Sequence, residues 1–139
     1  MIYKEKKTPS RVFRSILLAF ILACLMKFFL FDFMLTEGRS MIPAIRPGTI
    51  LFVNRIAYGF RLPWTDKYLI RWKIPKSGEI VVFYNPLGEI AVKRCLDINE
   101  YYMEDRFFLQ GDNDQESFDS RSYGPIPMDR ILGKVLGVK

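Results

Sequence analysis

The chain has 139 residues, which is enough for one compact β-rich domain beyond an N-terminal apolar segment but not for two. It contains no histidine and only two cysteines, so neither a Ser-His-Asp triad nor a Cys/His zinc site can be assembled, and we expect no metal and no cofactor. The formal net charge is +6, but basic residues crowd the N-terminus and no nucleic-acid motif accompanies them, so the expected partner is a membrane surface and not a nucleic acid.

The N-terminal stretch is predicted to anchor the chain in a membrane. Basic residues dominate positions 1–11, and an apolar run from Val12 to Phe31 has about the 20 residues that cross a bilayer as a helix. Lys27 interrupts the run near its far end, where its side chain can reach the headgroups. We therefore predict a cytoplasmic basic tail at 1–11, a transmembrane anchor helix at 12–33 and an extracytoplasmic domain at 34–139.

Two other interpretations of this N-terminus are weaker. A cleavable signal peptide has the same basic-then-apolar layout, but no small-x-small site precedes a plausible start of a mature chain. The stretch Ile21-Leu-Ala-Cys24 faintly resembles a lipoprotein box, yet cleavage there would leave a tether too apolar for a solvated linker. We therefore prefer the uncleaved anchor.

Beyond the anchor, short apolar runs separated by Gly and Pro turns indicate a mainly β, antiparallel domain. The predicted strands are 49–53, 79–84, 89–93, 107–109 and 131–138. Residues 32–38 are expected to be a short connector from the anchor. Segment 55–76 interleaves aromatic and basic residues, which suits either a membrane headgroup interface or a solvated loop whose aromatics pack back on the domain.

Ser40 lies in a short polar turn between the anchor and the first predicted strand. A serine hydroxyl is a weak nucleophile until a base takes its proton, and the base must itself be held in place. Without histidine, the base that can act at neutral pH is a lysine kept neutral by burial. Lys93 follows an apolar, β-branched run, where a strand would bury it. We therefore predict Ser40 as nucleophile and Lys93 as general base.

Three short motifs occur in order along the chain. They are Ser-Met-x-Pro at 40–43, Val-Lys-Arg at 92–94 and Gly-Asp-Asn-x-x-x-Ser-x-Asp-Ser-Arg at 111–121. Together they resemble the motifs of bacterial type I signal peptidases, the membrane-bound Ser-Lys endopeptidases that remove signal peptides from exported proteins. Segment 74–83 is also similar to the family's stretch ahead of its catalytic lysine, so the similarity covers most of the chain.

The resemblance implies a signal-peptidase-like fold, in which a transmembrane helix precedes a compact antiparallel β catalytic domain. Many relatives insert a large second β-subdomain before the Gly-Asp-Asn motif. Residues 94–110 leave no room for one, so we expect a minimal form. The implied location is the bacterial cytoplasmic membrane, crossed once, with the N-terminus in the cytoplasm and the catalytic domain on the extracytoplasmic face.

The implied activity is cleavage of N-terminal signal peptides from exported preproteins, after small residues at positions −1 and −3. The expected partners are those signal peptides and the lipid bilayer, and the oligomeric state is left open. An extended substrate is expected to add as a strand along the edge of residues 89–93. The apolar substrate pocket is expected near Met41, Ile45, Ala91 and Val92.

The resemblance also assigns supporting roles in the site. Ser117 corresponds to the serine whose hydroxyl orients the lysine amine. A charged cluster that supports the site corresponds to Arg94, Asp112, Asp119 and Arg121. The backbone N–H of Ser40 is the expected donor to the oxyanion.

Two departures from the family's pattern concern this site. Gly38 stands where some members carry a serine that adds an oxyanion donor, although other members also have glycine. Asp114-Gln115-Glu116 differs from the family's usual residues, which leaves the local ion pairing open. Two alternative functions remain open. The short interval at 94–110 mildly favours a dedicated Ser-Lys maturation peptidase of a conjugation or pilus system, and the altered 114–116 segment is the support for a catalytically silent, membrane-anchored paralogue that binds signal peptides.

Overall fold

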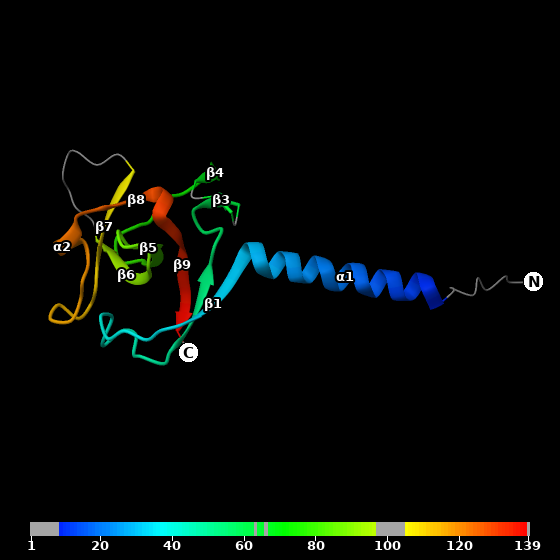
Figure 1. Cartoon of the computed structure of the whole chain (residues 1–139), viewed down its shortest axis with the longest axis horizontal. Coiled ribbons are helices and arrows are strands. Elements are labelled where there is room, and N and C mark those ends of the chain that lie inside the picture. Colours follow the sequence, from blue (N-terminus) through cyan, green and yellow to red (C-terminus); the bar gives the residue numbers. More distant parts are fainter. Residues whose placement is uncertain (1–8, 63, 66, 97–104, 139) are drawn as a thin grey trace, which may run out of the picture.

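The computed structural model of the chain describes residues 9–62, 64–65, 67–96 and 105–138. A long helix, α1 (Pro9–Leu30), projects from a β domain that contains the remaining elements (Figure 1). The mainly antiparallel β fold with an N-terminal apolar helix confirms the predicted fold class.

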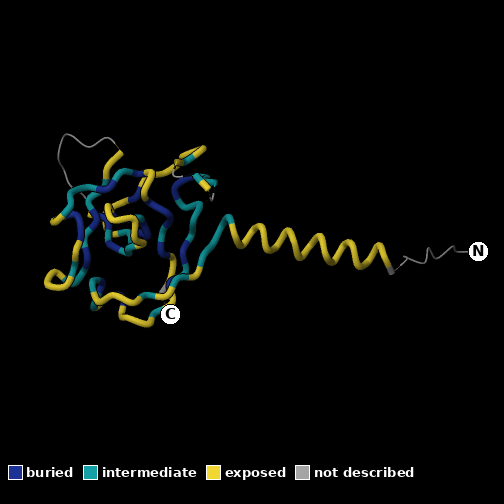
Figure 2. Tube along the Cα trace, in the orientation of Figure 1, coloured by how far each residue is buried: buried dark blue, intermediate teal, exposed yellow. Residues whose placement is uncertain are grey.

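The surface of α1 is apolar and exposed up to its last two residues, which are half-buried where the helix meets the domain (Figure 2). Among the described residues, Ser10–Leu30 is the one helical stretch long and apolar enough to cross a membrane, and none of it is buried against the domain. The helix ends at Leu30, three residues before the predicted anchor ends at position 33. The apolar run continues past this point because Phe31 already begins a strand, so hydropathy alone does not mark the boundary.

The domain is built on one antiparallel sheet of seven strands. These are β1 (Phe31–Leu35), β2 (Ile50–Asn54), β5 (Ile80–Tyr84), β6 (Ile90–Leu96), β7 (Arg106–Gln110), β8 (Ile126–Pro127) and β9 (Ile131–Val138). Their order in the sheet is β1-β2-β9-β5-β6-β7-β8. Two short helices, α2 (Ser120–Tyr123) and the 3-10 helix η1 (Met128–Arg130), lie on either side of β8 in the chain.

The five predicted strands correspond to β2, β5, β6, β7 and β9. Four further strands were missed. Of these, β1 occupies most of the predicted connector, while β3 (Gly59–Arg61) and β4 (Tyr68–Arg71) pair in a separate two-stranded sheet within segment 55–76. Only residues 97–105 connect β6 to β7, the interval in which the sequence predicts no second subdomain, and residues 97–104 of it lie outside the described part.

Strand β5 lies at the centre of the core because it is buried on both faces. Val81 and Phe83 belong to one buried cluster, and Val82 between them belongs to a second. A strand buried on both faces needs a continuous apolar run and not an alternating one, which is what residues 80–84 supply. Pairing of β5 with β6 places Lys93 directly opposite Val81, beside the first cluster.

The two glycines of β9 test how closely this strand packs against β2. A Cβ at Gly133 would lie 2.5 Å from the Asn54 carbonyl oxygen and 3.0 Å from Val53 Cγ1, whereas a Cβ at Gly137 meets nothing within 4 Å. Gly133→Ala is therefore expected to lower the free energy of unfolding by about 1–3 kcal/mol, as overpacking does. Gly137→Ala, the matched control, should change it by less than about 0.5 kcal/mol. Denaturant titration of the full chain in detergent measures both, and equal effects would contradict the observed packing of β9 against β2.

Candidate active site

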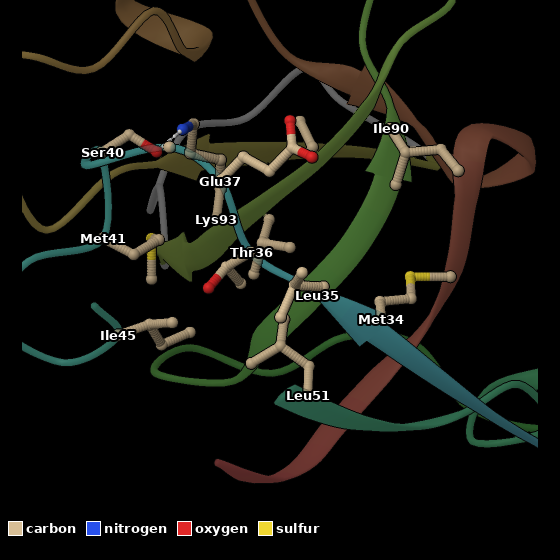
Figure 3. Close-up of a pocket in the computed structure, with 13 residues that line it drawn as sticks. Met34, Leu35, Thr36, Glu37, Ser40, Met41, Ile45, Leu51, Ile90 and Lys93 are labelled. Carbon is tan, nitrogen blue, oxygen red and sulfur yellow. Dashed lines mark hydrogen bonds between the residues drawn. The ribbon is translucent and has the colours of Figure 1, made fainter. Parts of the chain in front are cut away.

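The side chains of Ser40 and Lys93 meet although 53 positions separate them in the sequence. Ser40 lies in the loop that follows β1, and Lys93 lies in β6. The Lys93 Nζ atom donates a hydrogen bond of 2.5 Å to Ser40 Oγ (Figure 3). This arrangement brings together the two residues predicted as nucleophile and base.

The Lys93 side chain is buried, with 5% of the residue exposed. Burial lowers the pKa of its amine, because the charged form loses hydration. The negative charge of Asp119 raises this pKa in opposition, and the positive charge of Arg121 lowers it further. The net effect is a pKa below the ordinary value, which increases the fraction of neutral amine able to accept a proton.

The loop that carries Ser40 is closed at both ends by Thr36 and Thr49. The Thr36 hydroxyl donates to the Arg46 carbonyl at 2.9 Å and accepts from the Thr49 N–H at 3.1 Å. Between these ends, Met41 and Ile45 are buried in the second core cluster, and the Ile45 N–H donates to the Met41 carbonyl. Packing on one side and hydrogen bonds at the base therefore fix the position of Ser40.

The 111–119 loop holds Ser40 from the other side. The Asn113 N–H donates to the Ser40 carbonyl at 2.9 Å, and Asn113 Nδ2 donates to the Arg39 carbonyl at 3.1 Å. Gly111 permits this approach, because a Cβ there would lie 2.5 Å from the Ser40 carbonyl oxygen and would also collide with Ser117 Oγ. The glycine of the third motif is thus required by close backbone contact.

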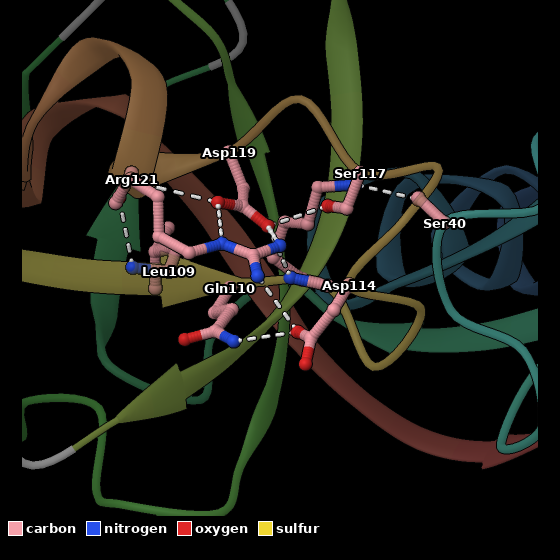
Figure 4. Close-up of polar contacts among 10 residues, drawn as sticks. Ser40, Leu109, Gln110, Asp114, Ser117, Asp119 and Arg121 are labelled. Atoms are coloured by element: carbon pink, nitrogen blue, oxygen red, sulfur yellow. Dashed lines mark hydrogen bonds and ion pairs between the residues drawn. The ribbon is translucent and has the colours of Figure 1, made fainter.

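The Asp119 carboxylate organises the polar side of the site (Figure 4). It is fully buried and accepts hydrogen bonds from the Gly111 N–H, the Ser117 hydroxyl and the Arg121 guanidinium. Burial alone would raise the pKa of this carboxyl, but those hydrogen bonds outweigh it and hold the pKa well below its usual range. Asp119 therefore remains ionised at neutral pH.

The Ser117 hydroxyl is hydrogen-bonded to Asp119. Its hydroxyl donates to Asp119 Oδ2 at 2.5 Å, and the hydrogen bonds in the described part of the chain do not join it to Lys93. Its role in orienting the lysine amine stays a prediction. The observed hydrogen bond is compatible with that role, because a hydroxyl that donates its proton to Asp119 still has lone pairs that can accept from an amine.

The other charged residues around the site form ion pairs. Arg94 binds Asp112 in a bidentate pair, with nitrogen–oxygen distances of 2.8 and 2.7 Å, and its third contact is the Gly78 carbonyl. This pair joins β6 to the 111–119 loop. In the segment that departs from the family's pattern, Asp114 pairs with Arg121 at 2.7 Å and Glu116 pairs with Arg39 at 3.5 Å. The ion pairing that the sequence left open is therefore satisfied locally.

A pocket of about 500 Å³ opens beside the Ser40–Lys93 pair (Figure 3). The four residues predicted to form the substrate pocket all line it: Met41, Ile45, Ala91 and Val92. The sequence missed six other residues that line it: Met34, Leu35, Thr36, Glu37, Leu51 and Ile90. Most of these residues come from the segment predicted as a connector, and they were missed because β1 was not recognised as a strand. Gly38 also lines the pocket, and a Cβ there would meet nothing within 4 Å.

One edge of β6 beside this pocket has no strand partner among the described residues. Strand β7 pairs with β6 only at Arg94–Leu96, whereas β5 pairs with it along its other edge. The Cys95 N–H donates to the carbonyl of Glu79, the residue just before β5. Because the backbone groups of successive residues in a strand point to alternate edges, those of Ile90 and Val92 point to the other, unpaired edge. An extended peptide can form main-chain hydrogen bonds there.

No group of three or more potential metal ligands is found in the described ranges.

Comparison with known proteins agrees with this geometry. Residues 10–99 and 97–138 match the family of signal peptidases, peptidase S26. The chain belongs to the signal peptidase family. Within it, Signal peptidase I of Pseudomonas fluorescens is 32% identical over 100 residues, which cover 68% of this chain and 35% of the relative. Signal peptidase I of Buchnera aphidicola subsp. Schizaphis graminum is 29% identical over 99 residues, covering 70% of this chain and 32% of the relative.

A third relative is matched over more of its length. The probable signal peptidase I-1 of Synechocystis sp. is 24% identical over an alignment of 163 positions, gaps included, which covers 87% of this chain and 77% of the relative. Family membership confirms the resemblance inferred from the three motifs. The chain spans only about a third of the length of the Pseudomonas fluorescens and Buchnera signal peptidases.

The role of Asp119 predicts how stability depends on pH. Its folded-state pKa lies below the value of about 3.9 of an unfolded chain, so its contribution to stability is complete above about pH 5 and is lost as the pH falls further. Asp119→Asn should cost about 3 kcal/mol or more at pH 7, because it leaves buried donors without an anion. The variant should then lose less stability than the wild type between pH 6 and pH 3.

A matched control uses the other carboxylate bound to Arg121. The Asp114 side chain is 70% exposed, so Asp114→Asn should cost no more than about 1 kcal/mol at pH 7. Denaturant titrations at both pH values measure these changes. Equal behaviour of the two variants would contradict the central place of Asp119.

Proposed function

We propose that the chain is a type I signal peptidase, a membrane-bound endopeptidase that cleaves N-terminal signal peptides with Ser40 as nucleophile and Lys93 as general base. The observation that carries this proposal is the hydrogen bond between Ser40 Oγ and a buried lysine amine in a chain without histidine. Family membership is independent support.

In the proposed reaction, the neutral Lys93 amine removes the proton from the Ser40 hydroxyl as its oxygen attacks the scissile carbonyl carbon. The resulting ammonium then gives this proton to the leaving amine, and the acyl group remains esterified to Ser40. A water molecule, activated by the same amine, hydrolyses the ester. The lowered pKa of Lys93 supports this role, because more of the amine is neutral at a given pH.

The oxyanion that forms in each step needs a fixed donor. We assign this role to the Ser40 N–H, since hydrogen bonds from Asn113 hold the neighbouring carbonyl groups of Ser40 and Arg39. Ser117 and Asp119 are proposed to position the lysine amine, through the hydroxyl of the former and the charge of the latter. Arg94, Asp112 and Arg121 are assigned to holding the surrounding loop in place.

The substrate is proposed to bind as an extended strand along the unpaired edge of β6. Backbone groups of Ile90 and Val92 would bind its main chain, as strand addition requires. Its residues at −1 and −3 would enter the pocket lined by Ala91 and Ile45. A pocket walled by branched and methyl-bearing side chains accepts small residues and excludes large ones sterically.

The helix α1 is proposed to span the cytoplasmic membrane once, with residues 1–11 in the cytoplasm and the β domain outside. The basic residues before the helix support this orientation. The adjoining sheet face is also apolar and exposed, at Phe33, Leu35 and Ile50. Lys27 Nζ lies 5.9 Å from the centre of the Phe33 ring, which places this cation at the junction between helix and domain.

Cleavage of a preprotein substrate with an Ala-x-Ala site, by the full chain in detergent, tests the proposal. The wild type should cut after the second alanine, and Ser40→Ala and Lys93→Ala should each lower kcat by at least about 10³-fold, because the two residues act as a unit. Ser122→Ala and Lys76→Ala alter exposed residues and should leave the rate unchanged.

Activity that survives Lys93→Ala would contradict the assignment of the base. A folded wild type that cuts no signal peptide would contradict the proposed activity and would favour a dedicated maturation peptidase or a silent paralogue that binds signal peptides. Assay of the candidate substrates and binding of the uncut signal peptide would separate those two alternatives.

A further inference from the structure

We propose that the β3–β4 hairpin is a second membrane contact of the domain, docking on the headgroup layer of an anionic bilayer. The contacting surface, called here the hairpin surface, consists of Trp64, Lys67 and residues 69–74. This inference rests on the proposed membrane insertion of α1 and is independent of the peptidase chemistry.

The first observation is exposure. Trp64 is 74% exposed and Trp72 is 51% exposed, so at least half of each residue faces solvent. Every residue from Leu69 to Ile74 is exposed, including three aliphatic side chains. A strand of a solvated domain normally buries one of its two faces, but β4 exposes both faces after Tyr68. Exposed tryptophan and aliphatic side chains gathered in one hairpin are typical of a binding site.

The second observation is that the domain presents this surface rigidly. The Tyr68 hydroxyl donates to the Ile131 carbonyl at 2.7 Å, and the Trp72 and Lys73 N–H groups donate to the Tyr58 carbonyl at 3.0 and 3.1 Å. Gly59 allows the backbone of β3 to approach Ile70 so closely that no side chain fits between them. The apolar side chains therefore point outward while their backbone is fastened to the core.

The third observation is position. The Phe60 ring of β3 stacks on Phe29 in the last turn of α1, with ring centres 5.9 Å apart. The Arg55 N–H donates to the Leu30 carbonyl at the end of the helix. Figure 1 shows β3 and β4 at the end of the domain to which α1 is attached. When α1 spans a bilayer, the hairpin therefore lies beside the headgroups.

The chemistry of the hairpin surface selects lipid over protein. Tryptophan is enriched at membrane interfaces, and Lys and Arg bind anionic lipids. Protein interfaces, in contrast, are depleted of lysine. Arg71 is already paired with Asp105 at 2.6 Å, so Lys67 and Lys73, both exposed, are the cations available to lipid phosphates.

The chain offers a direct test, because Trp64 and Trp72 are its only tryptophans. Their fluorescence is measured for the full chain in vesicles that contain lipids brominated on the acyl chains, either zwitterionic or with added phosphatidylglycerol. We expect a blue-shifted emission, quenching by brominated lipid and protection from acrylamide, all stronger in the anionic vesicles. Emission typical of water, full access to acrylamide and no quenching by lipid would overturn the proposal.

A matched control moves the reporter to the opposite end of the domain. In a Trp64→Phe, Trp72→Phe background, Gln115→Trp places one tryptophan at an exposed position of the 111–119 loop, which lies far from α1 in Figure 1. This tryptophan should remain accessible to acrylamide and unquenched by lipid. Lys67→Glu with Lys73→Glu should remove the difference between the two vesicle types, and a difference that persists would overturn the role of these charges.

Two further outcomes separate this proposal from others. The native tryptophans should give the same result at several protein concentrations in the vesicles; protection that grows with protein concentration would indicate a protein contact and overturn the proposal. Extraction of the chain by alkaline carbonate would show that α1 is not inserted, which contradicts the proposed anchor. Retention of the chain without quenching contradicts the hairpin contact alone. Ser40→Ala should give the same fluorescence as the wild type, so a failed cleavage assay leaves this test unaffected.

Discussion

Removal of the Lys93 amine from water is the physical constraint on which the site depends. An amine with an ordinary pKa of about 10.4 is almost fully protonated at neutral pH and cannot act as a base. Desolvation beside the central strands lowers that pKa, and the buried Asp119 carboxylate limits how far it falls. The fold must therefore bury a cationic side chain while keeping a hydroxyl within hydrogen-bonding distance of it.

The three sequence motifs act together to satisfy this constraint. The first places Ser40 in a loop held by core packing of Met41, the second supplies Lys93 from a central part of the sheet, and the third supplies the loop that binds Ser40 from outside. Asp119 accepts hydrogen bonds from four donor groups, which are the Gly111 N–H, the Ser117 hydroxyl, and the backbone N–H and guanidinium of Arg121. These bonds hold the polar wall of the site in place. Hydrophobic packing and buried polar contacts thus meet at one pair of side chains.

The sequence predicted the parts of this arrangement that depend on local pattern. The β-branched runs of β5 and β6 marked those strands, and the order of the motifs identified the family. It did not predict β1, because the apolar anchor and the apolar strand form one continuous run and Phe31 belongs equally well to either. Because β1 was not predicted, the pocket residues that it contributes were not predicted either. Nor could it choose between two orientations of the tryptophans in segment 55–76, since the position of that segment is set by long-range contacts such as the Tyr68–Ile131 hydrogen bond.

Direct titration of Lys93 in the full chain is the most direct test of this account. The protein, labelled with 15N at the lysine Nζ atoms and held in micelles, would be followed by NMR from pH 5 to pH 11, with Lys93→Arg identifying the signal. We predict one lysine with a pKa below about 10.4 whose signal is absent from the variant and shifts to lower pH in Asp119→Asn. If every lysine titrates at the ordinary value, Lys93 is not desolvated in solution and cannot be the base that activates Ser40.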